Sequence, residues 1–470
     1  LRLGIALWIL KRVALLSSYA DIRTVRAKKV GMGFVNRSSK TSSNIFYGWK
    51  LLALISFMGS LNNAFFSKGS ALFLLPVETS LGLSRATSSL IFSLARSEGA
   101  VEGPVVGYLV DRFGSKKMMV IGTVLAGIGF VIFALAPNVW MFAVAYLVFI
   151  AVGATMGFQH AIAATVNMWF SKYRVRALAI QEASGNLGSM LLIPLIGLLI
   201  AYFSWRWAAA LAATSYFFVI LPLSAFVKSS PESVGLLPDG ADPEELNKIR
   251  NAQQQGLSSS ASRTLSYYDN PDFSLREALL TPTYWFLLVG TMFRQIAKAP
   301  IQVHIVAILH WKGLDVATAS LIFAFWLGMN VPSKLFFGFI GDKVPKQVSL
   351  GGGMVLYAVS MLVLIYGASL WMFLLAAFLG GLAEGITPIN WGAIGDYFGR
   401  SYFATLRGII NLSHSWALVG LPWAAGWWFD RHDSYFMIIW VSFASALLSG
   451  IFYVLMRRPK APRRLEETRL

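Results

Sequence analysis

Long apolar stretches recur along nearly the whole chain, and they limit its possible folds more than any other feature of the sequence. Each is long enough to cross the roughly 30 Å hydrocarbon core of a bilayer, which takes about 20 residues of helix. Six stretches lie at 46–76, 86–110, 117–136, 139–169, 177–203 and 205–227, and six more at 283–309, 316–340, 348–368, 370–398, 406–429 and 435–456. Lipid offers the backbone no hydrogen-bond partners, so these spans are predicted to be helices, and runs of this length exclude a membrane β-barrel.

The spacing of the stretches predicts an all-α membrane protein with twelve transmembrane helices in two pseudo-symmetric six-helix bundles. The predicted parts are a basic tail at 1–45, a first bundle at 46–227, a linker at 228–280, a second bundle at 281–456 and a basic tail at 457–470. Within the linker, Asp242-Pro243 is typical of a helix start. Ser274, followed three residues later by Glu277, predicts a capping box that opens a second helix.

Composition and charge agree with a membrane protein. Hydrophobic residues make up 56% of the chain and charged residues only 13%, about half of the usual 25%, which excludes a disordered chain and an ordinary soluble enzyme. The 40 Lys and Arg outnumber the 22 Asp and Glu, for a net charge of +18. Nearly all cations outside the spans lie in the tails and on one side of the membrane, and the opposite loops contain Arg85, Arg206, Lys312 and Arg431. The positive-inside rule therefore predicts a multi-pass protein of the inner cell membrane with both termini cytoplasmic, and no nucleic-acid partner.

Several kinds of chemistry are not expected from this sequence. There is no cysteine, which excludes disulfides and thiolate metal sites. Gly351-Gly352-Gly353 is followed by Met354 and does not complete a phosphate-binding loop, which argues against an ATP-driven pump. We expect no metal, no cofactor and no enzymatic activity, and we expect a monomer. Residues 1–31, which precede the first methionine, are given no functional role.

A Gly-x-x-x-Asp turn occurs at the same place in both halves, directly after the second stretch of each. The first copy contains Gly107, Asp111, Arg112 and Gly114, and the second contains Gly338, Asp342 and Lys343. The glycine permits close helix approach, the acid suits a helix N-terminus or a basic partner, and the cations hold the turn in the cytoplasm. An ordinary charged turn would account for one copy, whereas two matched copies indicate an internal duplication. We expect these turns to latch the two halves in one conformation and to release in another.

The turn resembles the signature of the major facilitator superfamily, Gly-x-x-x-Asp-Arg-x-Gly-x-basic after helix 2 with a looser copy after helix 8. The resemblance covers the chain from about Tyr47 to Arg458, and it implies a secondary transporter whose two halves rock about a central cavity. Shorter segments resemble the prokaryotic monocarboxylate transporter-like branch, with the oxalate/formate exchangers as relatives. They are Tyr47-Gly48-Trp49, Ser84-Arg85-Ala86, Trp169-Phe170, 231–240 and Val303-His304.

Ionisable side chains inside the spans are candidate functional residues, because each costs a few kcal/mol at membrane depth. Arg294 is placed near mid-membrane in the seventh stretch, and Lys298 follows one helical turn later on the same face. The cations within the bundle are Lys68, Arg96, Arg294, Lys298 and Lys334, and the acids are Glu98, Glu102 and Glu384, so that five minus three leaves a charge of +2. This surplus favours an anionic substrate. The alternative is a set of structural ion pairs, with long side chains that extend to the membrane surface.

The family resemblance implies roles for some of these residues. Lys334 stands four residues before Gly338, where the family places an Arg that binds the substrate carboxylate; Lys keeps the charge but lacks the planar fork of Arg. Asn330 stands where proton-coupled members have an Asp, and Asn cannot titrate. Lys68 resembles an exofacial Lys of those symporters, and His414 falls where the oxalate exchangers carry a substrate-binding Lys. The alternative for Lys68 and His414 is structural, since such residues also extend to the surface or pack inside.

These observations predict a secondary active transporter that moves small monocarboxylate anions by alternating access, coupled to protons. The predicted substrate-binding residues are Lys334, Arg294, Lys298, Lys68 and His414, and the candidates for proton coupling are Glu98, Glu102 and Glu384. Exchange of two anions follows equally well if these acids are permanently paired with cations. The alternatives are an exchanger or symporter of dicarboxylates or organic phosphates, which Arg294 and Lys298 would suit, and a nutrient sensor that does not transport.

Overall fold

The computed structural model describes residues 46–82, 91, 102–254, 272–460 and 462. Across these residues the secondary structure is helical, and no strand occurs among them. The predicted tails at 1–45 and beyond 462, and the residues Arg96 and Glu98, lie outside the described residues. Eight helices in the described ranges are long and apolar enough to cross a membrane.

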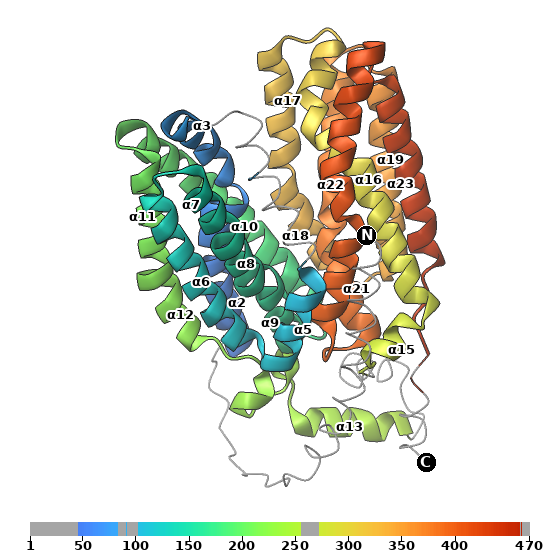
Figure 1. Cartoon of the computed structure of the whole chain (residues 1–470). Coiled ribbons are helices and arrows are strands. Elements are labelled where there is room, and N and C mark those ends of the chain that lie inside the picture. Colours follow the sequence, from blue (N-terminus) through green and yellow to red (C-terminus); the bar gives the residue numbers. More distant parts are fainter. Residues whose placement is uncertain (1–45, 83–90, 92–101, 255–271, 461, 463–470) are drawn as a thin grey trace.

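Two groups of helices lie side by side, one from each half of the chain (Figure 1). The first group contains α2 (Tyr47–Asn62), η1 (Asn63–Ser67), α3 (Ser70–Leu81), α5 (Gly103–Phe113), α6 (Ser115–Leu135), α7 (Val139–Val144), η2 (Ala145–Ala151), α8 (Val152–Ala154), η3 (Thr155–His160), α9 (Ala161–Trp169), α10 (Arg174–Tyr202), α11 (Trp205–Thr214), η4 (Ser215–Ile220) and α12 (Leu221–Phe226). The second contains α16 (Pro282–Trp311), α17 (Val316–Gly328), α18 (Asn330–Gly341), α19 (Lys346–Tyr366), α20 (Leu370–Ala383), η7 (Glu384–Ile386), α21 (Thr387–Phe398), α22 (Phe403–His432) and α23 (Phe436–Leu455). We call them the N-terminal and C-terminal groups.

Small residues bring helices into close contact inside the N-terminal group. A Cβ atom on Gly122 of α6 would lie 2.5 Å from the carbonyl oxygen of Gly153 in α8, so only glycine fits at this crossing. Beside it, a cluster of buried aromatic rings around Phe130 and Phe133 fills the space between α6 and its neighbours. These contacts make the group a packed bundle. Its outer surface exposes large apolar side chains such as Trp140 and Phe218.

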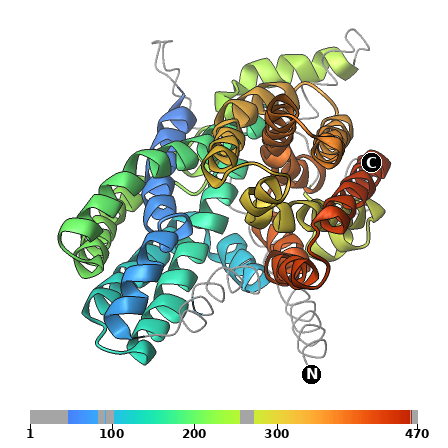
Figure 2. The ribbon, with the colours of Figure 1, turned by 90° about the horizontal axis from the view of Figure 1, so that it is seen from above.

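The two groups contact each other mainly through two helix pairs, α5 with α22 and α10 with α18. Both pairs lie toward the lower end of Figure 1, near α13, whereas the groups diverge toward the upper end. Seen from above in Figure 2, the groups stand on opposite sides, and α5 extends to the C-terminal group. We call the lower end the closed end. The contacts there fix which side chains of one group reach the other.

The linker contains the helix predicted to start at Asp242-Pro243, which is α13 (Pro243–Gln254). The short turns η5 (Pro231–Val234) and η6 (Pro238–Gly240) precede it, and α15 (Leu275–Leu279) leads into the C-terminal group. The predicted capping box at the start of α15 is present, because Ser274 and Glu277 each accept a hydrogen bond from the other's backbone N–H. Both predictions about the linker are therefore confirmed.

Two acids attach the linker to both helix groups. The Asp239 carboxylate accepts hydrogen bonds of 2.8–3.2 Å from the backbone N–H groups of 171–173, in the turn before α10. The Asp272 carboxylate accepts bonds from the N–H groups of 400–401, in the corresponding turn before α22. Burial raises the pKa of Asp239, which the three N–H donors partly offset. The linker is thus held at equivalent turns of the two halves.

Candidate functional site

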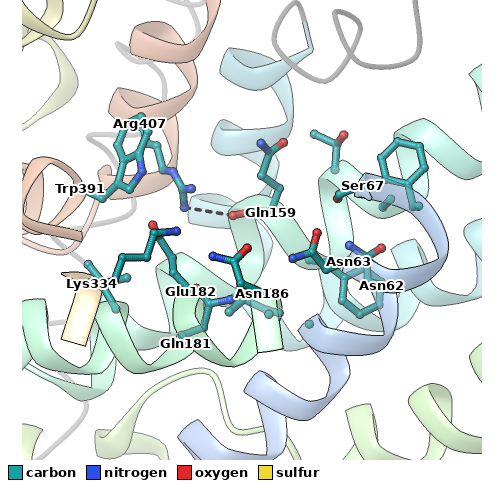
Figure 3. A pocket seen from close by; sticks show the side chains of 18 residues that line it. Asn62, Asn63, Ser67, Gln159, Gln181, Glu182, Asn186, Lys334, Trp391 and Arg407 are labelled. Carbon is teal, nitrogen blue, oxygen red and sulfur yellow. Dashed lines mark hydrogen bonds and ion pairs between the residues drawn. The ribbon is translucent and has the colours of Figure 1, made fainter. Parts of the chain in front are cut away.

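A cavity of about 380 Å³ lies between the two helix groups. Its wall comes from α2, η1, α8, η3, α9 and α10 of the N-terminal group and from α18, α21 and α22 of the C-terminal group (Figure 3). The polar and charged side chains on this wall are Asn62, Asn63, Ser67, Thr155, Gln159, Gln181, Glu182, Asn186, Lys334 and Arg407. The cavity therefore combines two cations and one acid with several carboxamides.

Lys334 is the predicted substrate-binding residue that lines this cavity. It lies on α18, and its Nζ is 3.0 Å from the Oε2 of Glu182 on α10, so the ion pair joins the two groups. Both side chains are largely buried, with exposed fractions of 12% and 18%. A substrate carboxylate that reached Lys334 would have to share the ammonium group with Glu182 or displace Glu182 from it.

Arg407, near the start of α22, is the second cation of the cavity. Its Nη1 donates a 3.0 Å hydrogen bond to the backbone carbonyl of Gln159 in η3, and its guanidinium lies 4.7 Å from the centre of the Trp391 ring. The Nε of Arg407 is buried and has no hydrogen-bond partner among the described residues. Arg407 thus belongs to the C-terminal group and bonds the N-terminal group. Its Nε remains available as a hydrogen-bond donor to an anion.

Glu182 and Arg407 were not predicted from the sequence. Each lies within about three helical turns of the start of its helix, where a charged side chain is expected to extend to the membrane surface. A signal was nevertheless present, because an ionisable residue within an apolar span is a functional candidate wherever it lies. Their role as cavity residues depends on the closed-end contacts, which bring the first turns of α10 and α22 against the opposite group.

Arg294 and Lys298 do not line the cavity; they form a separate buried cluster with Glu384. The Nζ of Lys298 lies 2.5 Å from the Oε2 of Glu384, and the Nη2 of Arg294 lies 3.9 Å from the same oxygen. Arg294 also hydrogen-bonds the hydroxyl of Thr387, and Gln302 donates a 3.1 Å bond to the Oε1 of Glu384. One acid therefore faces two cations in this cluster.

The remaining predicted residues within the described ranges lie apart from the cavity wall. Lys68 is exposed, directly after η1, and His414 is buried in α22, where its Nδ1 has no hydrogen-bond partner within the described chain. Glu102 is partly buried at the start of α5. Glu98 belongs to the residues that the structure does not describe. Of the predicted residues that the structure describes, Lys334 therefore lines the cavity and the others do not.

The acids of the repeated turn both bind helix N-termini of the opposite group. The Asp111 carboxylate accepts hydrogen bonds from the N–H groups of Ala404 and Thr405, at 3.2 and 2.8 Å, at the start of α22. The Asp342 carboxylate accepts bonds from 175–176, at 3.0 and 3.3 Å, at the start of α10. The orphan N–H groups and the positive dipole end of each helix favour such an acid. The two copies therefore make the same contact in opposite directions across the closed end.

The glycines of the repeated turn allow the helices of the two groups to approach each other at this contact. A Cβ on Gly107 would lie 2.3 Å from the carbonyl oxygen of Ala404, and a Cβ on Gly338 would lie 2.4 Å from the Cβ of Ala179, so both positions need glycine. Gly114 ends α5 with a φ of +87°, which glycine adopts without strain. The cations Arg112 and Lys343 are exposed, in agreement with a role in holding the turn in water.

Burial raises the pKa of Asp342 to about 6. Asp396 raises this pKa further, whereas Lys346 and the two N–H donors lower it. The Asp396 carboxylate forms one ion pair with Arg174 and a second one, 2.9 Å long, with Lys346. The charged groups at the α10–α18 contact are therefore coupled across the two groups.

A polar cavity between two groups of apolar helices is the architecture of a membrane transporter. The family model of the Major Facilitator Superfamily matches residues 52–297 and 287–470, so the chain belongs to this superfamily. The resemblance seen in the repeated turns is thereby confirmed.

Relatives of known name support the assignment. The chain is 24% identical over 402 residues to the oxalate:formate antiporter of Oxalobacter formigenes. The aligned residues cover 82% of this chain and 86% of the relative. It is 21% identical over 444 residues to monocarboxylate transporter 12 of Xenopus laevis, with 90% and 92% covered. Among solved structures, a double tryptophan mutant of XylE matches with a TM-score of 0.67 at 15% identity, over 90% of this chain and 99% of that one.

These comparisons establish the class of the protein. It is a multi-pass protein of the cell membrane with the all-helical fold of the superfamily, and a transporter rather than an enzyme. Its relatives include the monocarboxylate transporter branch that the shorter sequence segments indicated.

Proposed function

We propose that this protein is a secondary active transporter of organic monocarboxylate anions that works by alternating access. The observation that carries the proposal is the cavity between the two groups, where Lys334 and Arg407 face a single acid, Glu182. A net positive charge in a site of low dielectric favours an anionic ligand over a neutral one.

In this proposal the chain spans the membrane twelve times in two six-helix bundles, at 46–227 and 281–456, and the closed end is cytoplasmic with both termini. The concentration of Lys and Arg on one side supports this orientation. The described conformation is then open toward the outside, and the contacts of Asp111 and Asp342 at helix N-termini are the latch. Inward opening requires both contacts to break.

The cations of the cavity also join the two groups, which gives substrate binding a way to act on the conformation. Lys334 bonds Glu182 of the N-terminal group and Arg407 bonds the Gln159 carbonyl of the same group. A carboxylate that takes over these donors replaces contacts between groups by contacts to substrate, and a ligand shifts an equilibrium only through such differential contacts. Arg294, Lys298 and His414, which belong to the C-terminal group, and the more distant Lys68 remain candidates for contacts in another conformation.

Proton coupling is proposed through carboxylates near these cations. Glu384, Glu102 and Glu98 remain candidates, and the cavity adds Glu182. A substrate carboxylate at Lys334 would lie beside Glu182, and a proton on one of the two carboxyl groups would remove the repulsion between their negative charges. One anion and one proton then cross together without net charge.

A second candidate is a dicarboxylate exchanger. Two separate cations on the wall of one cavity, Lys334 and Arg407, favour it, since each could bind one carboxylate. Exchange would need no proton, and the Lys334–Glu182 pair would then reform between substrates.

Uptake of labelled lactate, pyruvate, formate and oxalate into proteoliposomes, with and without an imposed pH gradient, tests these proposals. Proton-coupled symport predicts accumulation of a monocarboxylate that depends on the gradient. Gradient-independent exchange of oxalate would favour the second candidate. Binding of these acids without any uptake would contradict transport altogether.

A further inference from the structure

Four carboxamide side chains on the cavity wall have no hydrogen-bond partner in the part of the chain that the structure describes. The amide groups of Asn63, Gln159, Gln181 and Asn186 make no hydrogen bond to any of the described residues. Asn62 differs, because its Oδ1 accepts a 2.8 Å bond from the hydroxyl of Tyr216. The four amides are thus placed by their helices, and within the described ranges they do not join one element to another.

Carboxamides at such positions restrict the ligand. Each offers donors and an acceptor, and a buried polar group without a partner destabilises the state that buries it. Water can satisfy these groups while the cavity is open, but closure around an apolar chain would leave them unpaired. A hydroxyl group both donates and accepts, so it is a suitable partner for a carboxamide.

The placement of the carboxamides adds a second restriction. Lys334 and Arg407 come from the C-terminal group, whereas Asn63 lies on the far side of the cavity, with Gln181 and Asn186 between them (Figure 3). One carboxylate has about four lone-pair sites, too few to pair with both cations and all four amides. A ligand that pairs with both sides therefore needs a charged end and polar groups further along its chain.

The size of the cavity agrees with a longer ligand. Its volume of about 380 Å³ falls in the range of roughly 300–1,000 Å³ that is typical of sites for drug-sized ligands. An acid of two or three carbons would fill only a small part of it.

We infer that the substrate is a polyhydroxylated monocarboxylate of the size of a sugar acid, with its carboxylate at Lys334 and Arg407 and its hydroxyls at the carboxamides. This inference rests on the proposed function and narrows it from organic acids in general to hydroxylated ones. A neutral sugar would satisfy the carboxamides but would leave the net positive charge of the cavity without an anion.

Binding of matched probes to the purified full-length protein, measured by titration calorimetry, tests this inference. Gluconate and hexanoate share the same carbon chain and the same charge, but only gluconate carries hydroxyls. We expect gluconate to bind about a hundredfold more tightly than hexanoate, because sites built to hydrogen-bond a hydroxyl discriminate strongly against analogues that lack it. Pyruvate and glucose complete the set as a short acid and a neutral sugar.

Two variants keep the side-chain size and remove the hydrogen bonds. In Gln181→Met and Asn186→Leu, measured separately, we expect gluconate affinity to fall about tenfold while hexanoate affinity does not fall. Asn251→Ala, on the exposed surface of α13, is the matched control and should bind gluconate like the wild type. A thermal unfolding midpoint identifies any variant that does not fold, and the other variant then decides.

The outcomes separate this inference from the proposed function. If hexanoate or pyruvate binds as tightly as gluconate, the inference is overturned while transport of organic acids stands. If glucose binds as tightly as gluconate, the anionic substrate is overturned, and with it both proposals. Gluconate affinity that is unchanged in both Gln181→Met and Asn186→Leu would also overturn the inference.

Discussion

At the scale of single residues, the pair of Lys334 and Glu182 matters more for binding than for stability. Its two side chains are largely buried and 3.0 Å apart. The desolvation of such a pair offsets much of its Coulomb attraction, so the net contribution to folding is small. Removal of one partner, by contrast, leaves an uncompensated charge. When Glu182 is the partner removed, the uncompensated charge is the ammonium group of Lys334, and an anionic substrate would pair with it.

Glu182→Gln should therefore strengthen anion binding. Lys334 would lose its competitor, and we expect the Kd of the transported acid to fall about tenfold, or about 1.4 kcal/mol. The same variant should lose the accumulation driven by a pH gradient, because Gln cannot carry a proton. Calorimetry and proteoliposome uptake measure the two effects.

Glu232→Gln is a matched control for this variant. Glu232 also pairs with a cation of the C-terminal half, Arg400, at 2.9 Å, but it lies in the linker away from the cavity. Its substitution should change neither affinity nor coupling. An unchanged or weaker affinity in Glu182→Gln would show that Glu182 does not compete with substrate.

At the scale of helices, the closed end depends on two equivalent contacts that combine a cap with close packing. Asp111 caps α22 and Asp342 caps α10, and a side-chain cap of a helix N-terminus contributes about 1 kcal/mol. Gly107 and Gly338 allow the backbones to approach within the distance that these caps need. Loss of either feature should shift the protein toward opening at this end.

Gly107→Ala tests the packing. The added Cβ would collide with the backbone of Ala404, and overpacking of this kind costs about 1–3 kcal/mol. We expect a larger population with the closed end open, measured as a longer distance between spin labels at Lys117→Cys and Val348→Cys. These exposed positions are equivalent in the two repeats, and the natural chain contains no cysteine. Gly352→Ala, where a Cβ meets nothing within 4 Å, should leave the distance unchanged.

Asp342 should make the closed end sensitive to pH. Its pKa is raised to about 6 in the closed contact, and it should return to about 3.9 when opening exposes the carboxyl to water. The closed form then binds more protons between these values, so a fall in pH from 7 through 6 toward 4 should favour closure. The spin-label distances should shorten over this range in the wild type.

The matched variant is Asp342→Asn, which keeps an acceptor for the helix N-terminus but cannot titrate. We expect its distances to depend less on pH than those of the wild type, because Asp111, whose pKa burial raises to about 7, still titrates in the equivalent contact. A wild-type distribution that lengthens as the pH falls would contradict the sign of the effect, and equal pH dependence in the variant would assign it to another group.

At the scale of the whole molecule, the helical membrane fold follows from the sequence because apolar length and backbone hydrogen bonding leave few alternatives. The repeated turn also predicts a contact for its acid, at either a helix N-terminus or a basic partner, and the structure places it at helix N-termini. The cavity does not follow in the same way. Arg407 and Glu182 lie early in their helices and read as surface residues, whereas the mid-span pair Arg294 and Lys298 meets Glu384 outside the cavity. The position of a residue along its span does not show which face of the helix contacts the other group.

Counterflow in proteoliposomes tests the central claim, that an organic anion crosses through the cationic cavity. Vesicles loaded with unlabelled gluconate or pyruvate are diluted into the labelled acid, with the wild type, Lys334→Gln and Arg407→Gln compared with Lys117→Gln as the exposed control. We predict uptake by the wild type and the control, and a loss of at least about tenfold in each cavity variant, with Lys334→Arg retaining part of it. Wild-type rates in both cavity variants, with unfolding midpoints unchanged, would contradict the account.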